Sequence, residues 1–254
     1  MKHVEIEGAG ETLVFLHGGN VAGWMWGEQV PAFADHHILV PDLPGFGESN
    51  DEEWVSIAAT ADNVADLIAG HAHGARAHVV GLSLGSSVAI ELAARHPDRV
   101  ASLFLASAQV APPLRRDMIA ARVLLSFWNQ RGFWTTLARS YGLAGDDAEL
   151  FVNTGLGIRR ETAVTIYDEV SRGLPSEVLA RVAAPTLVVA GEKDSRAITD
   201  ASLVMVRRGI PNTKTAIAPG MHHQWNIENV ELFNAALRAW LDARKVASGL
   251  GGSI

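Results

Sequence analysis

A glycine-flanked serine between an apolar run and a helical pattern is the feature that most constrains how this chain can fold. The run His78-Val79-Val80 predicts the end of a β-strand, and Gly81-Leu82-Ser83-Leu84-Gly85 follows it directly. Glycines two residues before and after the serine let a strand and a helix approach closely around a tight turn. A helical pattern of apolar residues then continues to His96-Pro97. The stretch therefore predicts a strand, a sharp turn and a helix, with Ser83 at the tip of the turn.

Apolar runs typical of buried strands alternate with helical patterns through both ends of the chain. Strands are expected near residues 4–7, 12–16, 38–40, 78–83, 100–106, 186–190 and 213–218. Helices are expected near residues 24–34, 55–72, 84–95, 198–208 and 230–245. Strands separated by helices imply parallel pairing with right-handed crossovers. The predicted fold class is α/β, with a doubly wound, mostly parallel sheet.

The middle of the chain interrupts this alternation. Pro112-Pro113 ends it, and no strand pattern follows until about Val182. Helical segments are expected over residues 115–129, 132–141, 146–154 and 161–172. We interpret residues 112–182 as an inserted helical cap, residues 1–111 and 183–247 as the core domain, and the glycine-rich residues 248–254 as a flexible tail.

Composition and charge narrow the function classes. The net charge is −7 and no stretch of Lys and Arg forms a basic patch, which argues against a nucleic-acid partner. The absence of cysteine excludes a disulfide framework, a thiolate metal site and a cysteine nucleophile. The first residues lack the apolar region of a signal peptide, and no apolar run reaches membrane-spanning length. We therefore expect a cytoplasmic protein without a membrane partner, either a monomer or a homodimer, acting on a small molecule.

Other polar residues are candidates for a site. The strand at 12–16 runs into His17-Gly18-Gly19-Asn20, where glycine N–H groups can point toward a ligand. Asp42 lies in a Pro/Gly-rich loop and is expected to form loop hydrogen bonds. His36-His37, and His71 with His73, have metal-ligand spacings, but no carboxylate or thiolate accompanies them, so surface histidines are expected. No glycine-rich phosphate cradle is present, and we expect neither a metal nor a cofactor.

Five short stretches occur in an order that resembles the α/β-hydrolase family over nearly the whole chain. They are Leu16-His17-Gly18-Gly19, Asp42-Leu43-Pro44-Gly45-Phe46-Gly47-Glu48-Ser49, Gly81-Leu82-Ser83-Leu84-Gly85, Gly191-Glu192-Lys193-Asp194, and His223 with Glu228, Glu231 and Phe233. Each stretch is expected at the end of a strand, and the order Ser83, Asp194, His223 matches the family's Ser…Asp…His order. The resemblance therefore rests on several motifs together rather than on one.

The resemblance implies a role for each of these residues. Ser83 would be the nucleophile, His223 its general base, and Asp194 the residue that orients the imidazole. The backbone N–H groups of Gly19 and Leu84 would form the oxyanion hole. His223 fits the family spacing to Glu228 and Phe233, whereas its neighbour His222 is expected to stabilise the loop or line the cavity.

The resemblance also implies a serine hydrolase that acts on a small, partly apolar carboxylic ester or lactone through an acyl-enzyme. Residues expected to contact substrate are Asn20, Trp24, Met118, Trp128, Trp134 and Trp225. Relatives that hydrolyse C–C bonds of meta-cleavage products keep the same triad, and His17-Gly18-Gly19-Asn20 is loosely similar to their oxyanion loop. Some family members sense small molecules with slow turnover or none. These two alternatives stay open at the level of sequence.

Overall fold

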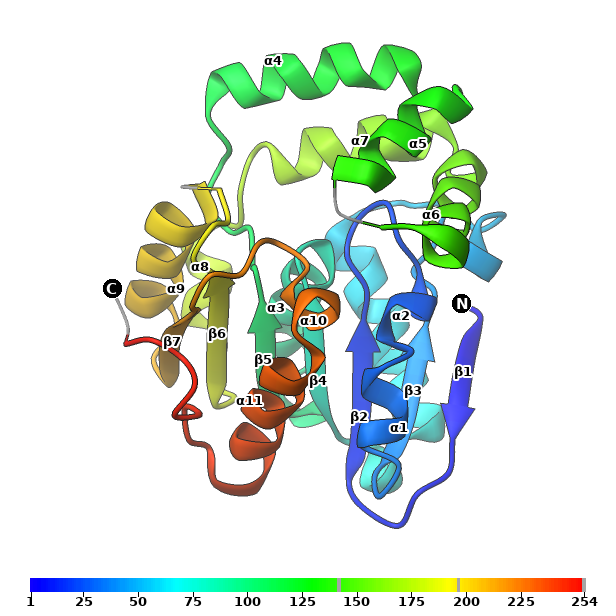
Figure 1. The fold of residues 1–254 in the computed structure, drawn as a ribbon. Helices are drawn as coiled ribbons and strands as arrows, with labels where there is room; N and C mark the ends of the chain where they lie inside the picture. Colours follow the sequence, from blue (N-terminus) through cyan, green and yellow to red (C-terminus); the bar gives the residue numbers. More distant parts are fainter. Residues whose placement is uncertain (141–142, 196, 253–254) are drawn as a thin grey trace.

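A seven-stranded sheet forms the centre of the protein, and helices cover both of its faces (Figure 1). The computed structural model describes residues 1–140, 143–195 and 197–252. The strands are β1 (His3–Ile6), β2 (Thr12–Leu16), β3 (His37–Pro41), β4 (Ala77–Leu82), β5 (Val100–Ala106), β6 (Thr186–Gly191) and β7 (Thr213–Ala218). Their order across the sheet is β1-β3-β2-β4-β5-β6-β7.

All neighbouring strands pair in parallel except β1, which runs antiparallel to β3 at one edge. Every residue of β2, β3, β4 and β6 is buried. Strands covered on both faces need apolar side chains on both, which explains why these segments are continuous apolar runs in the sequence. The predicted α/β class with a doubly wound, mostly parallel sheet is confirmed.

The helices of the core lie in two layers. The core helices and turns are η1 (Gly23–Trp26), α1 (Gln29–Ala32), η2 (Gly47–Ser49), α2 (Ile57–His71), η3 (His73–Ala75), α3 (Leu84–Arg95), η4 (Pro97–Arg99), α8 (Ser176–Ala180), η6 (Ala197–Ser202), α9 (Leu203–Gly209), α10 (Trp225–Glu228) and α11 (Val230–Ala243). Helices α1 and α11 pack together on one face, while α2, α3, α8 and α9 form the other layer (Figure 1). The helix expected over residues 24–34 is instead the two short pieces η1 and α1, and Pro31 removes a backbone donor there.

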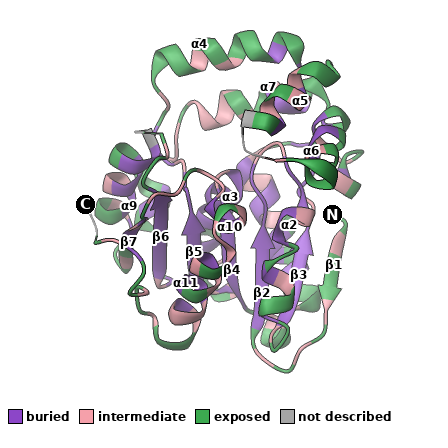
Figure 2. Ribbon diagram, viewed as in Figure 1, coloured by how far each residue is buried: buried purple, intermediate pink, exposed green. Residues whose placement is uncertain are grey.

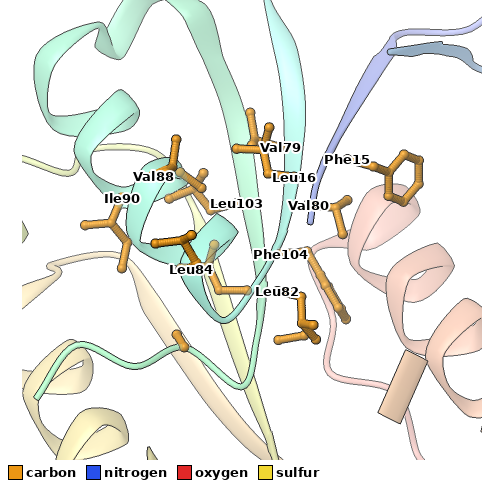
Figure 3. Close-up of a cluster of buried hydrophobic side chains, with 14 of the residues drawn as sticks. Phe15, Leu16, Val79, Val80, Leu82, Leu84, Val88, Ile90, Leu103 and Phe104 are labelled. Atoms are coloured by element: carbon orange, nitrogen blue, oxygen red, sulfur yellow. The ribbon is translucent and has the colours of Figure 1, made fainter. Parts of the chain in front are cut away.

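The hydrophobic core lies between the sheet and these helices, where buried residues concentrate (Figure 2). Figure 3 shows side chains of β2, β4, β5 and α3 that belong to this core. The labelled residues are Phe15, Leu16, Val79, Val80, Leu82, Leu84, Val88, Ile90, Leu103 and Phe104. Because β4 and α3 are both embedded in this core, the turn that joins them at Ser83 is held rigidly.

Further helices lie above the carboxyl ends of the strands (Figure 1). They are α4 (Arg115–Leu124), η5 (Leu125–Phe127), α5 (Arg131–Ser140), α6 (Gly145–Gly157) and α7 (Arg160–Val170). The helix expected over residues 132–141 corresponds to α5, and its expected last residue, Tyr141, lies outside the described residues. The last helix of the segment 112–182, α8, packs against α3 and α9 and so belongs with the core layer by its contacts.

The end of the chain packs on the sheet. Leu250 is buried, and Gly251 exchanges two backbone hydrogen bonds with Ile217 of β7, at 2.8 and 3.3 Å. An edge strand offers unpaired N–H and C=O groups, and these residues use them. Leu250 and Gly251, in the segment expected as a flexible tail, therefore contact the sheet, and residues 253–254 lie outside the described part. None of the helices that the structure describes is long and apolar enough to cross a membrane.

Candidate active site

Ser83 lies at the sharp turn between β4 and α3. Its backbone is at φ 51° and ψ −111°, a conformation that costs energy for a residue with a side chain. A Cβ at Gly81 would lie 2.7 Å from the backbone of Gly85, and one at Gly85 would collide with the carbonyl of Leu16. Ser86 donates a 2.8 Å hydrogen bond to the Gly81 carbonyl. The two glycines thus permit the close approach that presents Ser83 above the sheet.

Asp194 and His223 meet at the ends of β6 and β7. His223 Nδ1 lies 3.0 and 3.1 Å from the two carboxylate oxygens of Asp194. The Asp194 side chain is only 4% exposed, whereas that of His223 is 30% exposed. A carboxylate can only accept a hydrogen bond, so Nδ1 carries the hydrogen and Nε2 is the ring's basic position.

Backbone and side-chain contacts hold the strand-end loops together. Ser107, which follows β5, donates a 2.9 Å hydrogen bond to the carbonyl of His223. The N–H of Lys193 donates to the carbonyl of Met221 at 2.8 Å. A Cβ at Gly191 would collide with the His222 carbonyl, so this glycine permits the loops to touch. These contacts bring Asp194 and His223 together although 29 residues separate them in the chain.

His222 has a different environment from its neighbour. Its side chain is 61% exposed, and Nδ1 lies 2.8 Å from Glu228. Its backbone N–H donates to the other oxygen of Glu228 at 2.6 Å. Desolvation would raise the pKa of Glu228, but these hydrogen bonds outweigh it and lower the pKa. His222 therefore ties its loop to α10 and does not line the cavity beside Ser83.

Ser83 and His223 line the same cavity of about 150 Å³ between the sheet and the helices above it. Between described residues, no hydrogen bond joins the Ser83 hydroxyl to the His223 ring. The other lining residues are Gly19, Asn20, Phe46, Leu84, Ser87, Gln109, Trp128, Ile158, Ala163, Ile166, Tyr167, Val170 and Gln224. The N–H groups of Gly19 and Leu84 find no acceptor within the described ranges of the chain. The two residues whose N–H groups lack an acceptor thus both line the cavity that contains the serine.

Two of the residues expected to contact substrate line this cavity, Asn20 and Trp128. Met118 lines an adjoining cavity of about 270 Å³ that shares Gln109, Tyr167 and Val170 with the first. The placement of Met118 in the Ser83 cavity is therefore corrected to this neighbouring space.

Three tryptophans expected in the cavity lie elsewhere. Trp24 donates through Nε1 to Thr154 of α6 at 3.0 Å and is not a lining residue. Trp134 is fully buried among helices α5 and α6, and Trp225 is fully buried against Phe104 and Phe233. The structure therefore places none of these three side chains among the lining residues of the Ser83 cavity, because a large apolar side chain packs against its neighbours as readily as it lines a cavity.

Several lining residues escaped the sequence analysis. Gln109 follows β5 by three residues, and the carboxyl ends of parallel strands are where ligands gather, so its position was an available signal. Ile166, Tyr167 and Val170 share one face of α7 through their helical spacing. That spacing alone does not tell which way the face points.

His17 and Asp42 organise the loops around the cavity. His17 is fully buried; its Nε2 accepts from the N–H of Leu43 at 2.9 Å, so its Nδ1 donates to the carbonyl of Gly18 at 2.8 Å. Burial lowers the pKa of His17, which keeps the ring neutral. Asp42 accepts from the N–H groups of Gly23 at 2.6 Å and Glu48 at 2.8 Å. Both residues stabilise loops, as expected.

The chain is similar to known proteins over most of its length. The profile of the Alpha/beta hydrolase family matches residues 13–236. A pimeloyl-(acyl-carrier protein) methyl ester esterase of Aeromonas hydrophila subsp. hydrophila is 31% identical and covers 91% of this chain and 98% of its own. Est816, described as an N-acyl homoserine lactone degrading enzyme, has a TM-score of 0.73 and 26% identity, covering 94% of this chain and 96% of that one.

A hydrolase from Oleispira antarctica shows how well the fold itself is shared. It superposes with a TM-score of 0.81 over 95% of this chain and 94% of that chain, at 16% identity. The family profile and the esterase relative indicate the same family, and the solved structure shares its fold. The relatives support ester hydrolysis in general. The chain belongs to the alpha/beta hydrolase family.

Proposed function

We propose that this protein is a serine hydrolase that cleaves a small, partly apolar carboxylic ester or lactone through an acyl-enzyme. The observation that carries the proposal is that His223, whose ring bonds to Asp194, lines the same cavity as the strained Ser83 turn. Residues that follow β4 and β7 thus line one small space, and the residue that follows β6 bonds to one of them. The free N–H groups of Gly19 and Leu84 support the proposal independently.

In the proposed reaction, Ser83 Oγ attacks the ester carbonyl while its proton passes to His223 Nε2. Asp194 holds the ring and stabilises the imidazolium that forms. The N–H groups of Gly19 and Leu84 bind the negative oxygen of the tetrahedral intermediate, each donor lowering the barrier by about 3 kcal/mol. His223 then protonates the leaving alcohol, and in a second round it activates the water that hydrolyses the acyl-enzyme.

The cavity lining supports a small and partly apolar substrate. Phe46, Trp128, Ile158, Ile166 and Val170 supply apolar walls near Ser83. Asn20 and Gln109 are polar lining residues that could meet a substrate oxygen or amide. The methyl ester and lactone activities named for two relatives belong to the same chemical class.

The test is multiple turnover on short and medium aryl esters and on acyl homoserine lactones, with wild type and Ser83→Ala side by side. The matched control is Ser176→Ala, an exposed serine of α8 outside the cavity. We expect turnover in wild type and control and its loss in Ser83→Ala, with a trapped acyl adduct at Ser83 by mass spectrometry. Folded wild-type protein without turnover, or turnover that survives in Ser83→Ala, would overturn the proposal.

A further inference from the structure

Four histidines and two glutamates gather beside the edge strand β1, away from the Ser83 cavity. His3 and Glu5 lie two residues apart on β1, so their side chains point to the same side of the sheet, and Glu7 follows in the same alternation. His37 begins β3, His71 ends α2, and His73 begins η3. We call these six residues the His/Glu cluster. None of them lines the cavity that contains Ser83.

Three members of the cluster bring their ligand atoms close together. Glu5 Oε2 lies 3.1 Å from His71 Nδ1 and 3.8 Å from His3 Nε2. All three ligand atoms lie within 4.8 Å of one another. In a tetrahedral zinc site with bonds of about 2.0–2.1 Å, neighbouring ligand atoms are about 3.3 Å apart. The observed spacing therefore needs only small side-chain adjustments to surround an ion.

A second layer of hydrogen bonds orients Glu5. Its other oxygen, Oε1, lies 3.1 Å from Nε2 of His37, whose side chain is 1% exposed. A carboxylate only accepts, so His37 Nε2–H donates to it. His37 Nδ1 in turn lies 2.9 Å from Thr12 Oγ1, which accepts from the N–H of His73. Ligating carboxylates in metal sites are characteristically fixed by such outer hydrogen bonds.

The hydrogen bonds around Glu5 favour its charged form. Desolvation would raise the pKa of Glu5, but the hydrogen bonds from His37 and His71 outweigh it and lower the pKa. A metal ion would replace the hydrogen that His71 Nδ1 now places between its ring and Glu5.

We propose that His3, Glu5 and His71 bind one divalent transition-metal ion, with zinc as the physiological candidate and water as the fourth ligand. Two imidazoles and a carboxylate form a donor set that zinc accepts in proteins. The ion would join edge strand β1 to the end of α2 and so stabilise that edge of the sheet. The sequence analysis set the histidine pairs aside for want of a carboxylate, and the fold supplies one from a distant strand.

The test is isothermal titration of zinc chloride into chelator-treated, tag-free protein. We compare wild type with Glu5→Gln and with His71→Ala, and check each variant's fold by circular dichroism. The matched control is His222→Ala, which disrupts a His–Glu pair of 2.8 Å that has no third ligand beside it among the described residues. We expect one saturable site in wild type and control, affinity reduced at least tenfold in both cluster variants, and a zinc-dependent rise in wild-type Tm.

Three results would overturn the inference. The first is the absence of a saturable site in wild type, and the second is wild-type zinc affinity in both Glu5→Gln and His71→Ala. The third is loss of binding in a Glu7→Gln, His73→Ala double variant alone, which would move the site to Glu7, His37 and His73, whose ligand atoms also lie within 4.8 Å. Ester turnover should be unchanged by chelation, so this inference and the proposed function fail or succeed separately.

Discussion

At the scale of single residues, two adjacent histidines differ entirely in what they contact. His223 directs Nδ1 to a nearly buried carboxylate and lines the cavity with Ser83. His222 is exposed and bonded to Glu228. A base is useful only where its free nitrogen reaches the reacting group, so geometry rather than residue type separates the two.

Replacing each histidine by alanine should therefore have very different effects on ester turnover. We expect His223→Ala to lower kcat by about 10⁴-fold or more, since the proposed reaction then loses its general base. His222→Ala should reduce kcat less than tenfold. Asp194→Asn should fall between them, because the ring loses its orienting acceptor. Steady-state kinetics at pH 8 measure all three, and a dead His222→Ala beside an active His223→Ala would reverse the assignment.

At the scale of elements, α5 and α6 form a packed pair above the strand ends. Trp134 of α5 is fully buried, and its Nε1 donates to the carbonyl of Trp128 at 2.6 Å. Its ring packs against Phe151 of α6 with centroids 5.9 Å apart, and a Cβ at Gly155 would collide with it. One side chain thus joins two helices of the proposed cap.

Trp134→Ala should destabilise this pair by about 3–5 kcal/mol, because it removes a buried ring and leaves a cavity. If the cap is a unit of its own, hydrogen exchange should speed up in α5 and α6 while β4 and β5 stay protected. The matched control is Phe127→Ala, whose side chain is already 43% exposed and should change little. Uniform loss of protection through the sheet would show that cap and core unfold together.

At the scale of the whole molecule, an ion-pair network joins the two long helices on one face of the sheet. Asp62 of α2 bonds to Arg95 Nε at 2.9 Å and Nη2 at 2.7 Å, and lies 2.6 Å from His96 Nε2. The Arg95 guanidinium, followed by His96, lowers the pKa of Asp62 from its ordinary value of 3.8 to about 2. The folded state therefore stabilises the ionised form of the Asp62 carboxylate.

Because the pKa is depressed in the folded state, this contribution is present above about pH 4 and is lost as pH falls toward 2. We expect Asp62→Asn to lower the free energy of unfolding by about 1 kcal/mol at pH 7, since the carboxylate is partly exposed. The difference in free energy of unfolding between Asp62→Asn and wild type should shrink below pH 4. Urea unfolding at pH 7 and pH 2.5 measures it, and Asp66→Asn is the control on the same helix. A gap that is constant with pH would contradict the linkage.

The strands of the sheet, the sharp turn at Ser83 and the order of the candidate residues could all be predicted from the sequence. The strands β2, β3, β4 and β6 are runs buried on both faces, so their apolar composition follows directly from their burial. The glycines beside Ser83 are required by close backbone approach, which is a local property. Such features can be predicted because neighbouring residues in the chain cause them.

Which side chains line the same cavity or contact one another across the fold depends on the tertiary structure. Trp128 lines the cavity and Trp134 does not, although both lie in the proposed cap, because the packing of the helices sets which ring faces the cavity. His71 meets Glu5 across 66 residues for the same reason. Contacts between elements depend on how the elements pack, and periodicity within one element carries no information about the direction of its partner.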